Sequence, residues 1–199
     1  MAGYAEHRLD PGSVLWFTPG TVHRLVNTSG DLTILVVMQN AGLTEAGDAV
    51  LTFPPSVLAD PARYSAAARI PAIDGTAGAD AARRRRDLAV EGFCALRDAV
   101  ADRGPDALRP LYAAAARLVG DKALGWQHLW RDRALAQAEQ TGHQLAALCA
   151  GDAGHLRDAT VHVARSSDHE RFGMCGRLSL SAWDLDGVAT PDPPPTPNA

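Results

Sequence analysis

Along the first forty residues, short apolar runs alternate with tight turns, which is the pattern of antiparallel β-strands. The runs are rich in β-branched and aromatic side chains, and Pro19-Gly20 and Ser29-Gly30 separate them. The last run is apolar at nearly every position, so we expect that strand to be covered on both faces. The predicted strands are residues 14–17, 21–26 and 32–38.

A further short strand is predicted at residues 49–53, where Pro54-Pro55 ends it because proline cannot donate to a ladder. Beyond this point the apolar spacing becomes helical. The expected helices are residues 56–68, 79–102, 106–119 and 122–149, the last with an interruption near Thr141-Gly142. Gly104-Pro105 is expected to end the second of them.

Strand-like patterns return at residues 160–164 and 177–183 and could rejoin the first strands. The proline-rich tail is short of apolar residues, and we expect it to be disordered. The fold class expected is therefore α+β: a partial barrel, a helical extension, returning strands and the tail. These parts cover residues 1–55, 56–159, 160–185 and 186–199.

The composition and net charge of the chain exclude only a few classes of partner. The chain of 199 residues carries a net charge of −4, which gives no field that would attract nucleic acid. Arg83 to Arg86 are four consecutive arginines, but on a helix they point in four directions, so we expect a solvated surface. The three cysteines form no CxxC pair, and neither a leader nor a membrane span is visible. We expect a cytoplasmic protein without nucleic-acid or membrane partners.

The turn between the first two predicted strands carries a motif. Gly12, six residues, Pro19-Gly20, then His23 and Asn27 resemble the second conserved motif of the cupin superfamily, with Thr18 at the family's usual proline. The stretch from Val37 to Phe53, followed by a helical extension, is similar to an uncharacterised group of bacterial cupin-domain proteins. The resemblance implies a double-stranded β-helix, or jelly-roll β-barrel, over roughly the first 55 residues.

The resemblance also implies that His23 faces the barrel interior, where its neutral imidazole could bind a divalent metal such as iron, manganese, nickel or zinc. One histidine cannot hold a metal tightly. Further ligands would come from Glu6, His7, His162 or another subunit. A histidine that only lines the barrel is the alternative for His23, and simple solvent exposure is the alternative for His162.

Three functional hypotheses remain open at this level. The first is a cupin-like protein that binds a small organic molecule and uses a metal for a reaction whose catalytic residues are unknown. The second is a non-catalytic module that binds a ligand or oligomerises, with a homodimer as the expected assembly. This hypothesis is favoured because the cupin first motif with its paired histidines is missing. The third is a chain that lacks its first strands, for which exposed strand edges would favour strand exchange or aggregation.

Overall fold

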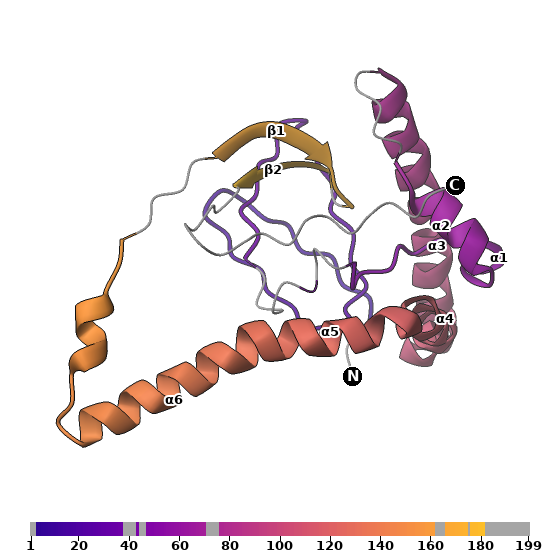
Figure 1. Cartoon of the computed structure of the whole chain (residues 1–199). Helices are drawn as coiled ribbons and strands as arrows, with labels where there is room; N and C mark the ends of the chain where they lie inside the picture. The colour runs from indigo at the N-terminus through magenta and orange to yellow at the C-terminus, as the bar shows by residue number, and fades with distance from the viewer. Residues whose placement is uncertain are drawn as a thin grey trace. The chain divides into compact units, whose positions relative to one another are not determined.

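The computed structural model describes residues 3–37, 43, 47–70, 76–161, 166–174 and 176–181. It divides into two compact units, Met1–Ala136 and Gln137–Ala199. Helices dominate the first, and the second combines a helix with a β-hairpin (Figure 1). None of the helices in these described ranges has the length and apolar character needed to cross a membrane.

The described residues of the first unit form a series of α-helices, and short 3₁₀ and π turns follow the last three of them. They are α1 (Pro55–Leu58), α2 (Pro61–Ala68), α3 (Thr76–Arg103), α4 (Arg109–Val119) and α5 (Ala123–Trp130). The turns are η1 (Pro105–Leu108), η2 (Gly120–Lys122) and η3 (Arg131–Leu135), of which η3 is a π turn. The second unit adds α6 (Ala136–Cys149), which begins one residue before the boundary, and the 3₁₀ turn η4 (Gly154–Asp158).

Proline, aspartate and glycine set the helix ends. Pro55 and Pro61 occupy first-turn positions, where a missing N–H costs nothing. The Asp60 side chain caps α2 by accepting the N–H groups of Ala62 at 2.9 Å and Arg63 at 3.2 Å. Gly104, with φ of +77°, ends α3 as predicted.

The predicted helices are found, with one difference. Residues 56–68 form α1 and α2, residues 79–102 lie within α3, and η1 with α4 covers residues 106–119. The interruption in the last predicted helix is the π turn η3 at Arg131–Leu135, and Thr141-Gly142 lies inside α6. The Thr141 hydroxyl donates to the Gln137 carbonyl at 2.9 Å, which keeps this polar side chain compatible with the helix.

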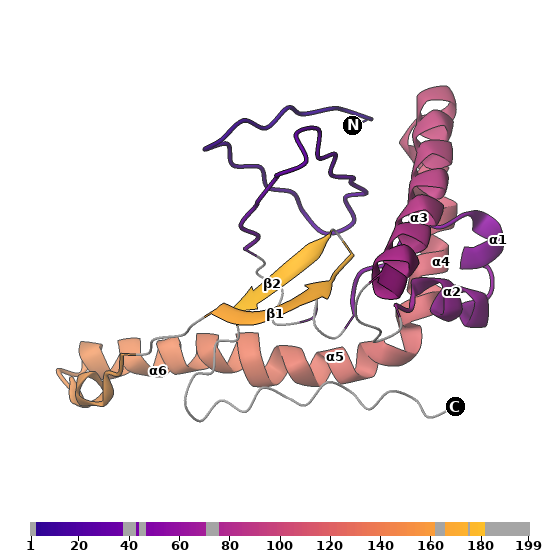
Figure 2. The ribbon, with the colours of Figure 1, turned by 90° about the horizontal axis from the view of Figure 1, so that it is seen from above.

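The predicted cupin jelly roll is wrong for the part of the chain that the structure describes. Residues 3–37 form no strand, and neither do residues 49–53; Figure 2 shows the N-terminal segment as a winding tube. Its turns do form: the Thr21 N–H donates to the Thr18 carbonyl at 3.3 Å, and the Gly30 N–H donates to Asn27 Oδ1 at 2.8 Å. The turns predicted from the sequence are therefore confirmed, whereas the paired strands that a β-barrel requires are not found in residues 3–37.

The core of the first unit forms where residues 50–53 cross the helices. Phe53 is 1% exposed and packs with Leu58, Leu111 and Ala114, the four buried hydrophobic residues of the described chain. The Thr52 hydroxyl donates to the Ala89 carbonyl of α3 at 2.9 Å. The Thr52 hydroxyl thus has a partner on α3, and this hydrogen bond offsets the cost of removing it from water.

Gly92 lets the Thr52–Phe53 backbone lie directly on α3. A Cβ at Gly92 would stand 2.0 Å from the Thr52 carbonyl oxygen and 2.7 Å from the Phe53 carbonyl carbon. A Cβ atom never comes so close to an oxygen to which it is not bonded, so only glycine fits this position of the helix.

The second unit carries a two-stranded antiparallel hairpin, β1 (Ser166–Phe172) and β2 (Arg177–Ser181), in which Phe172 pairs with Arg177. The Gly173 N–H donates to the Gly176 carbonyl at 2.7 Å and closes the turn. β2 lies within the predicted range 177–183. It pairs with β1 and with no strand of the N-terminal segment, so the expected return of late strands to a barrel is not seen in the described residues.

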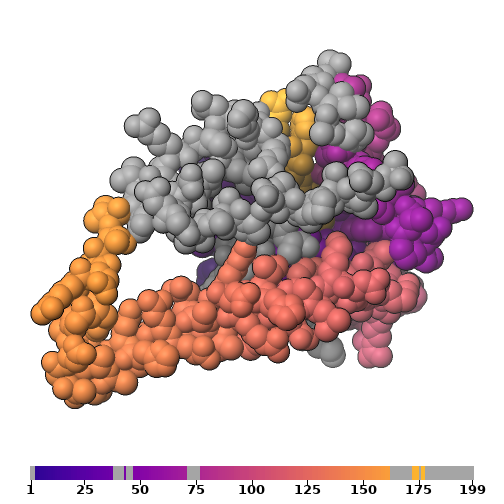
Figure 3. Space-filling view, in the orientation of Figure 1, coloured from indigo at the N-terminus to yellow at the C-terminus, as the bar shows by residue number. Residues whose placement is uncertain are grey.

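The side chains of α6 are visible on the face drawn in Figure 3. Leu145 and Leu148 on this helix are both exposed.

We predict that Gly92→Ala destabilises the fold. Helix propensity alone would make alanine better by about 1 kcal/mol, but the clash with Thr52 should instead lower the free energy of unfolding by about 1–3 kcal/mol. Urea unfolding measures the change.

Gly125→Ala in α5 is the matched control, because a Cβ there meets nothing within 4 Å. It should be neutral or stabilising. Equal stability of the two variants would contradict the close contact at Gly92.

Candidate functional site

The predicted metal ligand His23 lies on the surface of the N-terminal segment. Its Nδ1 is 3.1 Å from the Thr21 carbonyl oxygen, so the Nδ1–H tautomer is the one that this contact favours. The imidazole also stacks near Phe17, with ring centroids 4.3 Å apart. The ring is therefore oriented by its own turn, and no barrel interior surrounds it.

The other predicted ligands do not join it. Glu6 accepts a hydrogen bond from the Tyr4 hydroxyl, and this bond raises the pKa of Tyr4. His7 is exposed, and His162 lies outside the described residues. Within the described ranges no three histidine, cysteine, aspartate or glutamate side chains come together as a metal site. The described ligands therefore do not fit a bound metal, and the metal stays a prediction from the sequence.

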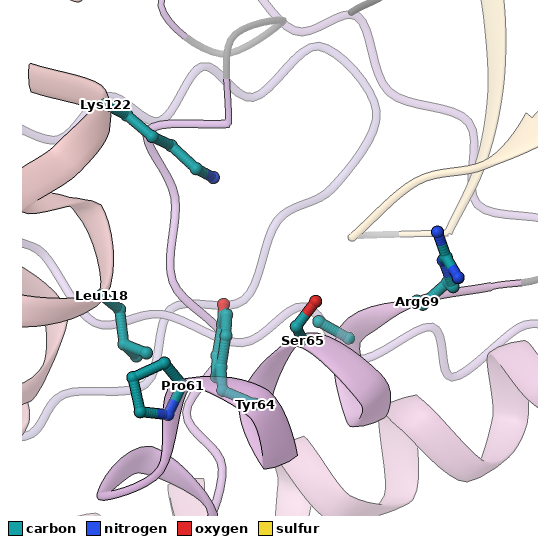
Figure 4. Close-up of a pocket in the computed structure, with 7 residues that line it drawn as sticks. Pro61, Tyr64, Ser65, Arg69, Leu118 and Lys122 are labelled. Atoms are coloured by element: carbon teal, nitrogen blue, oxygen red, sulfur yellow. The ribbon is translucent and has the colours of Figure 1, made fainter. Parts of the chain in front are cut away.

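A second site, which the sequence did not indicate, lies among the helices of the first unit. It is an open hollow of about 360 Å³, here called the α2 hollow (Figure 4). Three elements build it: α2 with its C-cap, α4 and η2. It is lined by Pro61, Tyr64, Ser65, Ala68, Arg69, Leu118 and Lys122.

Tyr64 stands at the centre of the α2 hollow and links it to the core. Its hydroxyl accepts the Leu51 N–H at 3.1 Å, and its ring lies 5.5 Å from that of Phe53. Burial raises the pKa of Tyr64, more than the Leu51 hydrogen bond and the charge of Arg85 lower it. The half-buried side chains of Tyr64, Ala68 and Leu118 form the floor of the hollow.

The rim of the α2 hollow is cationic. In Figure 4 the Lys122 side chain reaches in from one side and Arg69 stands at the other, with the Tyr64 and Ser65 hydroxyls between them. Both cations are exposed, and neither forms an ion pair with a carboxylate of the described residues. By contrast, the neighbouring Arg63 pairs with Asp60 at 3.5 Å.

Sequence reasoning missed this site because its residues carry no motif. One signal was present: Lys122 is the only lysine of the chain, among 18 arginines. A lysine offers a compact ammonium where an arginine offers a planar guanidinium, so the two are not interchangeable at a binding site.

The arginine run behaves as the sequence predicted. Arg83 pairs with Asp80 at 2.5 Å and Arg86 with Asp87 at 2.6 Å, while Arg85 donates to the Ala68 carbonyl at 3.2 Å. These side chains are therefore engaged within the protein and along its exposed helix surface.

We predict that Tyr64→Phe lowers the free energy of unfolding by about 1 kcal/mol at neutral pH, because the Leu51 N–H loses its acceptor. In the native protein the raised pKa of Tyr64 means that the folded chain holds its proton to higher pH than the unfolded chain. This contribution to stability is complete below about pH 10 and is lost as the pH rises through the folded pKa.

The difference between wild type and Tyr64→Phe should therefore shrink under alkaline conditions. Urea unfolding at neutral pH and above about pH 10 tests this. A difference that is constant over that range would contradict the environment described for Tyr64.

Comparison with known proteins gives no relative: no family model, no curated protein and no solved structure matches this chain.

Proposed function

We propose that this chain is a cytoplasmic, non-catalytic binding module that holds a small organic molecule in the α2 hollow. The observation that carries the proposal is the convergence of seven side chains from three elements around a volume of about 360 Å³. Sites for small molecules span roughly 300–1,000 Å³ and combine an apolar lining with a few polar groups.

The composition of the α2 hollow supports this function. Its floor is formed by side chains that pack on the core, so it is held in one shape before a ligand arrives. A preformed site loses less conformational entropy on binding than one that must be ordered by its ligand. Ser65 and the Tyr64 hydroxyl supply hydrogen-bonding groups that can orient the bound molecule.

We predict that Ala68→Trp abolishes ligand binding, because an indole at this position fills the α2 hollow. Ala66→Trp is the matched control, since Ala66 is exposed on the same helix and does not line the hollow. The measurement is ligand-observed NMR with a mixed panel of neutral, acidic and basic small organic molecules.

Wild type and Ala66→Trp should bind the same members of the panel, and Ala68→Trp should bind none of them. Binding that survives Ala68→Trp, or a panel without any binder, would refute the proposed function.

A second function, self-association, is favoured by a different observation. Residues 14–37 leave many large apolar side chains uncovered; Leu35 is 91% and Trp16 83% exposed. Exposed apolar patches of this kind mark interaction surfaces on soluble proteins. The other members more than a third exposed are Val14, Leu15, Phe17, Leu25, Val26, Leu32, Ile34, Val36 and Val37.

The occupant we propose for this surface is a second copy of the chain. A stable interface needs roughly 20–30 residues from each partner, and the segment from Val14 to Val37 supplies that number by itself. Its backbone forms no ladder in residues 14–37, so two copies related by a two-fold axis could pair backbone to backbone. The hydrogen-bonding groups of each copy would then find the partner they require.

We predict that Leu35→Asp weakens the dimer at least tenfold, because it buries an unpaired carboxylate in the interface. Leu124→Asp on α5 is the control, since Leu124 is also highly exposed but lies outside the segment. Sedimentation velocity over a dilution series measures the dissociation constant. A wild-type protein that is monomeric at high concentration would contradict self-association.

A further inference from the structure

We infer that the ligand of the α2 hollow is an organic anion, with a carboxylate or phosphate group held between Arg69 and Lys122 and an apolar body on the floor. This inference rests on the proposed function and names the chemical class of its ligand. It starts from the charge of the lining: two cations and no acidic side chain among the seven residues, in a chain whose net charge is −4.

The two cations line the same hollow. They come from different elements, Arg69 from the C-cap of α2 and Lys122 from η2, and they stand on opposite sides of the hollow (Figure 4). Like charges that face one cavity repel each other, and an anion between them converts that repulsion into attraction. The Arg69 guanidinium can grip two oxygens of the anion at once, whereas the Lys122 ammonium acts as a compact point charge.

Gly47 lies beside the Lys122 ammonium. A Cβ at Gly47 would lie 3.3 Å from Lys122 Nζ, which is tighter than an ordinary contact between these atoms, and its φ of +76° also favours glycine. The absence of a side chain at Gly47 thus leaves space beside the amine.

The hydroxyls and the floor define the rest of the ligand. Ser65 and Tyr64 lie between the cations in Figure 4, and the Ser65 hydroxyl can donate to a third oxygen. Pro61, Ala68 and Leu118 offer only carbon to the ligand and can cover an aromatic or aliphatic body. Inorganic phosphate alone would leave this surface unused, so the fit is to an organic anion.

The single lysine makes a direct test available. Reductive methylation with ¹³C-formaldehyde labels the Lys122 amine and the chain's N-terminal amine while keeping both charges, so one side-chain signal in the NMR spectrum reports on the α2 hollow. The probes are 2-naphthoate, 2-naphthyl phosphate and the neutral isostere 2-naphthamide. We expect both anions to shift the Lys122 signal in a saturable way and 2-naphthamide to leave it unmoved.

Variants separate the charge from the cavity. Arg69→Gln should weaken binding of the anions about threefold to fivefold, as expected for a solvent-exposed ionic contact. Arg63→Gln on the same helix should leave it unchanged, because Arg63 pairs with Asp60 and does not line the hollow. Raised salt should weaken binding of the anions in parallel.

The outcomes distinguish this inference from the proposed function. Equal binding of 2-naphthamide and 2-naphthoate, or no effect of Arg69→Gln, would overturn the anionic ligand while leaving a binding hollow. A second result would also overturn the anionic ligand and leave a binding hollow. In it, neither anion moves the Lys122 signal, whereas neutral members of the wider panel bind and Ala68→Trp blocks them. Preference for the phosphate over the carboxylate, or the reverse, identifies which of the two groups the site accepts.

Discussion

The close approach of the Thr52–Phe53 backbone to α3 at Gly92 is the contact on which the first unit depends. It brings Phe53 into the centre of the core, and Phe53 in turn supports the ring of Tyr64. Few residues of the described chain are fully buried. A small core tolerates little displacement, so this one glycine controls a large share of the packing.

The α2 hollow is a by-product of that packing. The Leu51 N–H, held beside the core by the same segment, fixes the Tyr64 hydroxyl, and Ala68 and Leu118 pack against the core from two helices. The position of the floor is therefore set by core contacts, while the rim is formed by long exposed side chains. Such a division separates the stability of the site from its selectivity, because rim residues can change without disturbing the core.

The sequence predicted the helices well because helix formation depends on local spacing and on end signals, as at Asp60 and Gly104. It failed for the strands predicted in the first 53 residues. The apolar runs at residues 14–37 indicate an extended backbone, but a sheet also needs partners that no local pattern supplies. For the same reason the sequence identified His23 but could not identify which side chains surround it. The α2 hollow was missed because its residues come from α2 and from α4 and η2, which lie far from α2 in the sequence and meet it only in the folded chain; Lys122 alone offered a trace of it.

The Tyr112 hydroxyl of α4 donates to the Gly20 carbonyl at 3.1 Å, across 92 residues of chain. This contact has a consequence during protein synthesis. Ribosomes add about 5–20 residues per second, so on the order of 10 s pass between the synthesis of Gly20 and that of Tyr112. Throughout that interval the apolar side chains of the N-terminal segment are exposed to solvent on a nascent chain, where a ribosome-associated chaperone would meet them first.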